Sequence, residues 1–256
     1  MEMRSLTMCA KYCMTKNGCK SFSFTENTRT CDTYSKALME TTAASSSSTK
    51  FFSKSPLSGV YDYTVTGGPS IQVYLDMDTE DGPWIVIQRR TNGDVDFFRN
   101  WAEYKSGFGD LSGNFWLGNQ NIHLLTSTPM ILRVELEGWD GTTGYAQYSS
   151  FQIANEAQNY RLAIAGFSGN VSFDALATHN GYDFSTYDRD NDSIKGNCAS
   201  NHKSAWWYHD CYDSNLNGIY IVDGGITEVS SMLWRNFPHT DAWSTLKKCT
   251  MKIRNQ

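Results

Sequence analysis

The sequence has no apolar run approaching the ~20 residues that a membrane-spanning helix needs, which excludes a membrane span from these 256 residues. It has no excess of positive charge either: the net charge is −5, which argues against nucleic acid as the main partner. Enzyme motifs such as G-x-S-x-G, H-E-x-x-H and G-x-x-x-x-G-K-[ST] are absent, so we expect a protein that is not an enzyme. Aromatic residues are plentiful at 14%, and with 20 glycines they favour a loop-rich fold over a helix bundle.

Cysteine is absent between residues 31 and 198, so the seven cysteines form two groups. The first group is Cys9, Cys13, Cys19 and Cys31, and the second is Cys198, Cys211 and Cys249. Dense cysteines in a short segment are typical of a disulfide-stabilised module, and their spacing does not match the close pairs of structural zinc sites. We therefore expect disulfides and a secreted, extracellular protein. Because Met1–Thr7 lacks the apolar segment of a secretory signal, we expect a fragment whose natural N-terminus is missing.

A stretch of small polar residues, Thr41–Thr49, separates two parts of different composition. The residues before it carry a net positive charge, and the residues after it carry a net negative charge. Stretches rich in serine and threonine of this kind act as flexible linkers. We therefore predict a small module at 1–40, a linker at 41–50 and a larger domain at 51–256.

The larger domain contains several strand-like runs and two short helix candidates. The predicted strands are Ile71–Met77, Trp84–Arg90, Met130–Glu137, Tyr145–Ile153, Arg161–Phe167, Gly218–Val222 and Thr250–Arg254. The predicted helices are Asn100–Gly107 and Asn119–Leu125. The C-terminal third is rich in Gly, Asn, Asp and Tyr and shows little periodicity, and long irregular stretches inside a domain are usually functional.

The run Asp188–Gly196, with the sequence DRDNDSIKG, is the strongest local motif. Its oxygen-bearing side chains stand at alternate positions and can turn towards one centre, and the glycine permits a tight backbone path. Calcium is a hard cation that takes six to eight oxygen ligands, including backbone carbonyls, so the motif suits calcium. The alternative is a solvated turn, which is what an isolated run of this composition usually forms.

Cys198 and Cys211 enclose residues 199–210, which contain the aromatic run Trp206–Tyr208. A disulfide between the two cysteines would hold the aspartate-rich segment rigidly beside these aromatic side chains. The aromatics are either core residues or the braces of a shallow pocket. Both roles are compatible, because neighbouring side chains on an extended segment face opposite ways.

A zinc or nucleophilic site is the competing interpretation of the same segment, which contains His202, His209, Asp210 and Cys211. We favour the disulfide, because Cys211 has a partner in Cys198. A sulfur in a disulfide neither attacks a substrate nor binds a metal as a thiolate.

Several motifs of the larger domain occur together in a known family. They are Trp84–Arg90 (WIVIQRR), Asp96–Gly109, Asn114–Gly118 (NFWLG), Phe184–Asp192 (FSTYDRDND), Ala205–Tyr208 (AWWY) and Ser214–Gly218 (SNLNG). On these motifs, residues 51–256 resemble a fibrinogen C-terminal-like domain. Residues 1–40 resemble part of a PAN/apple module, from Cys9 to Cys31.

The resemblance implies an α+β fold with a central antiparallel sheet, short helices and a loop-rich lobe that carries calcium and ligand sites. It places calcium on the side chains of Asp190 and Asp192 and on the backbone carbonyls of Ile194 and Gly196. It implies one disulfide in the lobe and two in the first module, namely Cys198–Cys211, Cys9–Cys31 and Cys13–Cys19. Cys249 then has no partner within the domain, and it is either buried or bridges to another chain or to the missing N-terminus.

The resemblance also implies a ligand site beside Cys211. In ficolin- and tachylectin-like members a cis peptide, here Asp210–Cys211, aims backbone N–H groups at the acetyl oxygen of a sugar, and an apolar funnel takes the acetyl methyl. This sequence departs from their pattern, with Tyr212 for a common His, His202 for a common Tyr, and Glu228–Val229 for Tyr-Ala. The Glu228 carboxylate favours a ligand with a cationic group over an acetyl methyl. The expected ligand-binding residues are His202, Asp210, Cys211, Tyr212, Glu228 and Val229.

We therefore expect a secreted, calcium-dependent, lectin-like recognition protein that binds acetylated or related carbohydrates on glycans or glycoproteins, with a role in innate immunity by analogy. Weak single sites of this kind gain useful binding from multivalency, so we also expect an oligomer. The alternative is an extracellular matrix or receptor-binding module that uses the same lobe for a protein partner. Two glycosylation sequons are present, Asn170–Ser172 and Asn191–Ser193, and ion binding would obstruct the second.

Overall fold

The chain divides into two compact units, Met1–Leu57 and Ser58–Gln256. The computed structural model describes residues 57–65, 68–222, 230–239 and 243–256, together with the backbone of three strands nearer the N-terminus.

The described part of the first unit is a three-stranded antiparallel sheet in the order β2-β1-β3. Its strands are β1 (Ser21–Thr25), β2 (Thr30–Tyr34) and β3 (Thr49–Ser53). β3 pairs with β1 from end to end, so residues 49–53 belong to this unit rather than to a linker at 41–50 and a domain starting at 51. Strand formation suits this segment, because it contains Thr49, Phe51 and Phe52, and threonine and phenylalanine are enriched in strands. Cys9, Cys13, Cys19 and the side chain of Cys31 lie outside the described residues, and so do their predicted disulfides.

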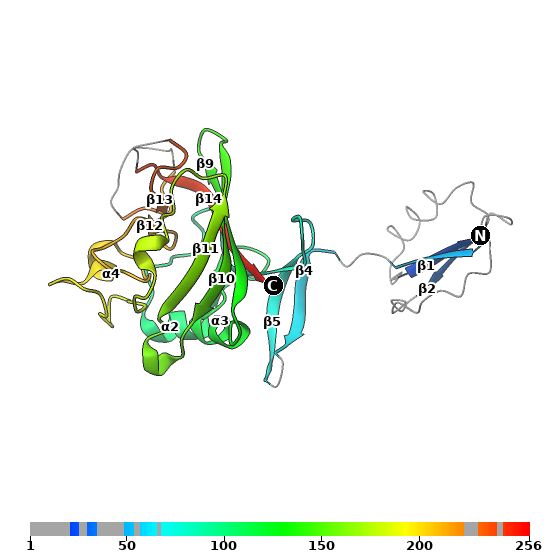
Figure 1. Ribbon diagram of the computed structural model, residues 1–256, viewed down its shortest axis with the longest axis horizontal. Coiled ribbons are helices and arrows are strands. Elements are labelled where there is room, and N and C mark those ends of the chain that lie inside the picture. The colour runs from blue at the N-terminus through cyan, green and yellow to red at the C-terminus, as the bar shows by residue number, and fades with distance from the viewer. Residues whose placement is uncertain are drawn as a thin grey trace. The chain divides into compact units, whose positions relative to one another are not determined.

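The second unit is built on a nine-stranded antiparallel sheet, shown in the middle of this unit in Figure 1. The main order is β11-β10-β9-β14-β6-β5-β4, and the short pair β7–β8 joins it at β6. The strands are β4 (Gly59–Thr64), β5 (Ser70–Asp76), β6 (Trp84–Arg90), β7 (Phe108–Gly109), β8 (Phe115–Trp116), β9 (Met130–Gly138), β10 (Thr143–Ile153), β11 (Leu162–Gly169) and β14 (Leu246–Arg254). A separate small pair consists of β12 (Ser214–Asn215) and β13 (Leu233–Trp234). This arrangement is the α+β fold with a central antiparallel sheet that the sequence predicts.

The two faces of the sheet differ in polarity. On β9 the side chains alternate between buried and half-buried, with Leu132, Val134 and Leu136 in the core and Arg133 and Glu135 on the other face. Because successive side chains of a strand point to opposite faces, one face of the sheet builds the core and the other carries charged groups.

The helices are short. They are α2 (Trp101–Ser106), α3 (Asn119–Leu125) and α4 (Cys198–Asn201), with 3-10 turns at Glu156–Gln158 and Ala177–His179. Figure 1 shows α2 and α3 at one end of the sheet, and α4, β12 and β13 in a loop-rich lobe at its side. None of the helices in the described residues is long and apolar enough to cross a membrane.

Helix α2 begins with a reciprocal cap. The Asn100 side chain accepts a hydrogen bond from the Glu103 N–H at 2.9 Å, and the Glu103 carboxylate accepts one from the Asn100 N–H at 3.2 Å. This capping box satisfies two backbone donors that have no partner inside the helix. The helix then buries Trp101 and Tyr104 in the core and ends at Gly107, whose φ of 92° favours glycine.

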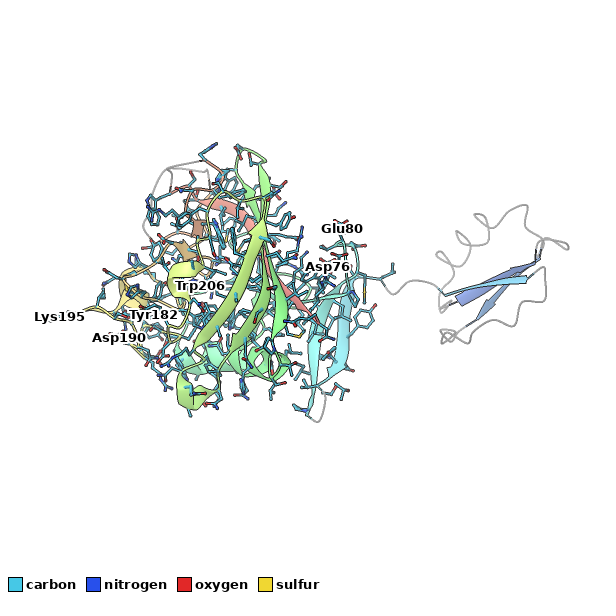
Figure 2. The ribbon with its side chains drawn as sticks, in the orientation of Figure 1. Asp76, Glu80, Tyr182, Asp190, Lys195 and Trp206 are labelled. Carbon is cyan, nitrogen blue, oxygen red and sulfur yellow. A yellow bond between two sulfur atoms is a disulfide. The ribbon has the colours of Figure 1, made fainter. Side chains whose placement is uncertain are left out.

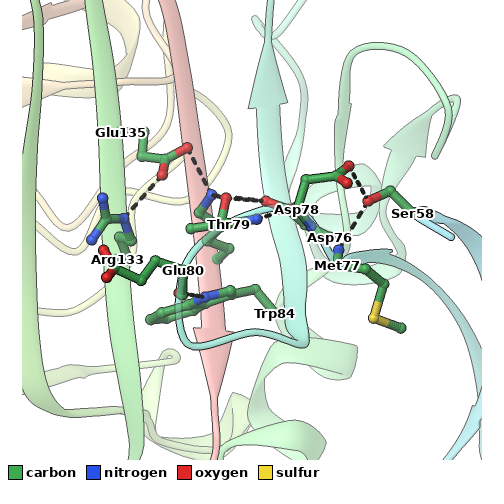
Figure 3. Close-up of polar contacts among 10 residues, drawn as sticks. Ser58, Asp76, Met77, Asp78, Thr79, Glu80, Trp84, Arg133 and Glu135 are labelled. Atoms are coloured by element: carbon green, nitrogen blue, oxygen red, sulfur yellow. Dashed lines mark hydrogen bonds and ion pairs between the residues drawn. The ribbon is translucent and has the colours of Figure 1, made fainter. Parts of the chain in front are cut away.

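A buried polar cluster joins the first hairpin of the second unit to its last strand (Figure 3). The side chain of Lys252 on β14 is only 1% exposed, and its Nζ lies 2.8 Å from Asp76 Oδ2 and 2.7 Å from Glu135 Oε2. It also donates to Thr79 Oγ1 at 2.6 Å. Burial opposes ionisation of Asp76, but hydrogen bonds from Lys252 and Thr79 outweigh this effect and hold its pKa at about 2.

Cys249 is a free, buried cysteine on β14. Its Sγ lies 3.4 Å from Met232 Sδ and 3.4 Å from Gln88 Oε1 in the core. Burial raises the pKa of this thiol to about 12, so it stays protonated at neutral pH. Of the two alternatives for Cys249, the structure shows the buried one.

We expect Cys249 to resist alkylation in the native protein and to react once the protein is unfolded, because the thiolate is the reactive form. The measurement is mass spectrometry of the Cys249 peptide after iodoacetamide treatment, with and without guanidinium. Equal labelling in both conditions, or a disulfide from Cys249 to a second chain, would contradict the burial.

Candidate functional site

The lobe that contains the predicted site is held together by side chains that bond to backbone. Asp192 accepts hydrogen bonds from the Ile194 N–H at 3.0 Å and from the Cys198 N–H at 2.7 Å. The Asn197 side chain accepts one from the Ser200 N–H at 2.8 Å and so caps α4. Asp and Asn residues favour such local bonds, which replace the regular ladders that this part of the sequence does not form.

Asp190 and Asp192 lie side by side at the outer end of the lobe. Asp190 Oδ1 accepts a hydrogen bond from the Asp192 N–H at 3.2 Å, and Figure 2 shows Asp190 and Lys195 towards the outer edge of the lobe, with Trp206 further inside. Burial and then the neighbouring Asp190 carboxylate raise the pKa of Asp192. Gly196 follows with a φ of 146°, a conformation that side chains disfavour.

The donor set of this segment fits a hard cation. The described residues hold no cluster of three or more His, Cys, Asp or Glu side chains able to bind a metal. A site here would therefore combine the two adjacent carboxylates of Asp190 and Asp192 with backbone carbonyls, an all-oxygen set of the kind that calcium takes. Ile194 and Gly196 are the residues whose carbonyls the family resemblance adds to that set.

Asp188, the first residue of the acidic motif, has a structural role instead. Its Oδ1 accepts hydrogen bonds from the Trp101 N–H at 2.9 Å and from the Thr186 hydroxyl at 2.7 Å. It therefore ties the first residue of α2 to the lobe, a position where a carboxylate is favourable because helix N-termini carry partial positive charge.

Cys198 and Cys211 form a disulfide with a Cα–Cα distance of 5.7 Å. The aromatic run between them, Trp206–Tyr208, is fully buried. Trp207 donates from Nε1 to the Tyr160 carbonyl at 2.7 Å, and the Trp206 and Trp207 rings lie 5.0 Å apart. Of the two roles that the sequence leaves open for these residues, the structure shows the core role.

Three aromatic side chains meet beside the disulfide, and we call them the aromatic wall: His202, Tyr212 and Trp243. The rings of His202 and Tyr212 are 4.8 Å apart in an edge-to-face arrangement, and those of Tyr212 and Trp243 are 6.0 Å apart. All three are half-buried, and burial raises the pKa of Tyr212 to about 12. Because the rings are only partly covered, the wall offers apolar surface to a ligand.

The remaining predicted ligand residues differ in their exposure to solvent. Cys211 is half-buried next to the wall, and Asp210 is exposed. Glu228 and Val229 lie outside the described residues. His209, part of the competing zinc interpretation, stacks on Tyr182 with a ring separation of 4.2 Å.

The expected cis peptide at Asp210–Cys211 is wrong for this structure. The cis peptide bonds of the described residues are Gly82–Pro83 and Phe237–Pro238, and both precede proline. Here the Cys211 carbonyl accepts a hydrogen bond from the His209 N–H at 3.0 Å, which closes a tight turn with the peptide in its trans form. The trans form is favoured by about 3 kcal/mol for a residue other than proline.

A buried histidine, His179, bonds to the backbone segments next to the aromatic wall. The Nδ1 of His179 lies 2.7 Å from the Trp207 carbonyl, and its Nε2 lies 3.3 Å from the Asp213 N–H and 3.2 Å from the Ser214 N–H. Burial lowers the pKa of His179 to about 4, so the ring is neutral at pH 7. This network assigns the proton to Nδ1, which donates, while Nε2 accepts from the backbone that directly follows Tyr212.

Sequence reasoning missed Trp243 and Arg235 as members of the site. Arg235 bonds to Asp213 Oδ1 at 2.8 Å, and its guanidinium carbon lies 5.4 Å from the centre of the Trp243 ring. Both residues reach the wall from a segment distant in sequence, so no local spacing reveals them. The only available signal is that an arginine and a tryptophan follow the predicted ligand residues Glu228 and Val229 in the sequence.

The nine-stranded sheet and its disulfide-closed lobe form one α+β domain with a loop-rich side. Residues 48–256 match the family of the C-terminal globular domain of fibrinogen beta and gamma chains, and the chain belongs to this family. Residues 1–56 match the PAN domain.

Curated relatives agree with this assignment. Human angiopoietin-related protein 7 is 45% identical over 202 residues, which are 77% of this chain and 58% of the relative. Human ficolin-3 is 45% identical over 179 residues, which are 70% of this chain and 60% of the relative. The chain thus matches only about three fifths of the length of these proteins.

Solved structures show the same fold. The fibrinogen-like globe domain of human ANGPTL2 has a TM-score of 0.74 and 39% identity, covering 77% of this chain and 92% of that domain. Lamprey fibrin D-dimer, in complex with the peptide Gly-His-Arg-Pro-amide, has a TM-score of 0.68 and 33% identity, covering 77% of this chain and 69% of that one.

Proposed function

We propose that this protein is a secreted, calcium-dependent recognition protein whose lobe binds acetylated or related carbohydrates, with a role in innate immune recognition. The observation that carries the proposal is the aromatic wall of His202, Tyr212 and Trp243 beside the Cys198–Cys211 disulfide. Binding sites commonly combine apolar and aromatic surface with a few polar groups that fix orientation.

The wall suits a sugar because each partner has both apolar and polar parts. A pyranose ring presents C–H groups on one face, which pack on aromatic rings, and hydroxyl groups at its edge. Arg235, held by Asp213 at 2.8 Å, places a guanidinium 5.4 Å from the Trp243 ring centre. Its N–H donors are suited to hydroxyl, acetyl or carboxylate oxygens of a ligand.

Calcium has a supporting role in this proposal. Asp190 and Asp192, with the carbonyls of Ile194 and Gly196, would hold the ion. The ion would supply positive charge that neutralises the two adjacent carboxylates and stiffens the segment leading into Cys198. Asp192 already bonds to the Cys198 N–H at 2.7 Å, so the ion segment connects directly to the disulfide and the wall.

A protein ligand is the second candidate, and one comparison favours it. The related lamprey fibrin fragment is in complex with a peptide ligand, which supports use of this fold for protein segments. Here Tyr212 and Trp243 form an aromatic surface, which also suits the side chains of a peptide. In either case, assembly into oligomers would raise the useful affinity of a weak single site.

The test is binding of the full chain to immobilised N-acetylated carbohydrate, measured with calcium, with a chelator and after calcium is restored. We expect binding to be lost with the chelator and in Asp190→Asn/Asp192→Asn. We also expect Tyr212→Ala to weaken it by about tenfold, the value of one aromatic contact. Phe167→Ala, an exposed aromatic on β11, is the control and should bind normally.

The outcomes separate the two candidates. Binding that survives the chelator would remove calcium from the mechanism. Absence of binding to any acetylated carbohydrate, combined with capture of a protein partner in excess free N-acetylglucosamine, would favour the protein ligand instead. Equal losses in Tyr212→Ala and Phe167→Ala would show that the aromatic wall is not the site.

A further inference from the structure

The two glycosylation sequons of the chain lie in different environments. Asn170 is exposed and directly follows β11. Its Oδ1 accepts a hydrogen bond from the Tyr145 N–H at 2.7 Å, which fixes the side chain while leaving the Nδ2 without a hydrogen bond to the described residues. Ser172, the third residue of this sequon, is also exposed.

Asn191, in the second sequon, forms hydrogen bonds with buried residues of the lobe. Its Nδ2 donates to the carbonyl of Phe184 at 2.7 Å, and Phe184 is fully buried. Its backbone N–H donates to the Ser185 hydroxyl at 3.0 Å. A sugar on this nitrogen would disturb the hydrogen bond to Phe184 at a half-buried position, so we expect no glycan on Asn191.

Asn170 also borders a groove on the solvent face of the sheet. The groove has a volume of about 370 Å³ and is lined by Asn170 together with Arg133, Glu135, Tyr145, Lys248 and Thr250 from β9, β10 and β14. It lies on the charged face of the sheet and shares no residue with the aromatic wall of the lobe.

The groove has the composition of a sugar site. The Arg133 guanidinium covers the Tyr145 ring at 3.8 Å, which holds that ring in place. Arg133 bonds to Glu135 through Nε at 2.9 Å and retains four further N–H donors. The carboxylates of the groove are Glu135 and Glu137, which pair with Lys252 and Lys248 at 2.7 Å each. Beside these ion pairs, each carboxylate has further capacity to accept hydrogen bonds from sugar hydroxyl groups, and the Thr250 hydroxyl can donate to them.

We propose that Asn170 carries an N-linked glycan and that the first sugars of this glycan lie in the groove. In the transfer step, Asn170 Nδ2 forms a bond to C1 of the first sugar of a lipid diphosphate-linked oligosaccharide. The C1–O bond to the diphosphate breaks, the lipid diphosphate leaves with the electron pair, and the amide loses one proton to a carboxylate of the transferase.

Covalent attachment to Asn170 explains why the glycan, rather than a free sugar, occupies the groove. A covalently attached sugar reaches a neighbouring site at high effective concentration, so weak contacts suffice to hold it. The hydrogen bond from the Tyr145 N–H goes to the oxygen of the Asn170 amide, which glycosylation keeps, so attachment costs no contact of the fold. This inference shares with the proposed function only the passage through the secretory route.

The first test concerns occupancy. The full chain, joined to a secretion leader, is produced in a eukaryotic host and analysed by peptide mass spectrometry before and after treatment with a glycan-releasing amidase. We expect a glycan on Asn170 and none on Asn191. Ser172→Ala and Asn170→Asp, which keeps the oxygen acceptor, should remove the glycan, while the matched variant Ser193→Ala should leave it unchanged. Secreted protein with an unmodified Asn170 would overturn the inference without affecting the carbohydrate-binding proposal.

The second test concerns the groove. We expect the amidase to release the glycan from the native protein about tenfold more slowly than from the unfolded protein, because bound sugars are protected. Tyr145→Ser should remove most of this protection. Gln147→Ser, a change at the next outward position of β10 outside the groove, is the control and should retain it. Equal release rates in the native and unfolded protein would show that the glycan extends into solvent and would overturn the groove part.

Discussion

Acidification from pH 6.5 to pH 4 is expected to lower the free energy of unfolding, with His179 as a major cause. The pKa of its ring is about 4 in the folded protein, against 6.5 for the unperturbed group. Over this interval the unfolded chain binds a proton that the native state does not, so stability is full above pH 6.5 and falls as the pH approaches 4. The shift corresponds to a loss on the order of 3 kcal/mol.

The change His179→Gln separates this effect from other titrations. We expect the variant to be less stable at pH 7, because glutamine does not reproduce both the bond to the Trp207 carbonyl and the acceptor for Asp213 and Ser214. We also expect its stability to depend less on pH between 4 and 6.5. Urea unfolding at pH 7, 5.5 and 4.5 measures both. His239→Gln, at an exposed position, is the control, and parallel pH profiles for wild type and His179→Gln would refute the assignment.

The change Lys252→Met is expected to cost about 3–5 kcal/mol of stability, because it leaves charged groups without their buried partner. Nζ of Lys252 lies 2.8 Å from Asp76 and 2.7 Å from Glu135, and its side chain is almost fully covered. Without the lysine, the pKa of Asp76 is expected to rise from about 2 towards its ordinary value. The stability that Asp76 contributes is present above pH 4 and is lost as the pH falls towards 2, and the variant should lose this component.

Urea unfolding at pH 7 checks this value. The control is Lys105→Met, which removes a lysine whose side chain is 42% exposed and which pairs with Glu156 at 2.6 Å. An exposed pair of this kind contributes less than about 1 kcal/mol. Equal losses for the two variants would show that the buried cluster (Figure 3) contributes no more than a surface ion pair.

Sequence patterns located the elements whose side chains are buried in a regular way. The predicted strand Trp84–Arg90 and the predicted helix Asn119–Leu125 coincide with β6 and α3. β4 was missed because it lies at the edge of the sheet, where most of its side chains are exposed and no alternation marks it. The predicted strand Gly218–Val222 is not one, because only Ile219 forms an isolated bridge, with Ser231.

The candidate site was predictable only where its residues are close in sequence. The acidic pair Asp190 and Asp192 and the disulfide Cys198–Cys211 belong to one short stretch, so spacing brings them together. His179 and Trp243 reach the same site from other parts of the chain. Their contributions depend on tertiary packing, which no local pattern encodes.

The position of β14 has a consequence for how the chain reaches this structure. The final strand, Leu246–Arg254, lies between β9 and β6, so it joins the group β11-β10-β9 to the group β6-β5-β4. During synthesis on the ribosome these two halves exist before the strand that unites them, and each exposes an unpaired edge until residues 246–254 emerge. Such long-range pairing slows folding. Until it is complete, the unpaired strand edges make the chain prone to aggregation, which chaperones counteract.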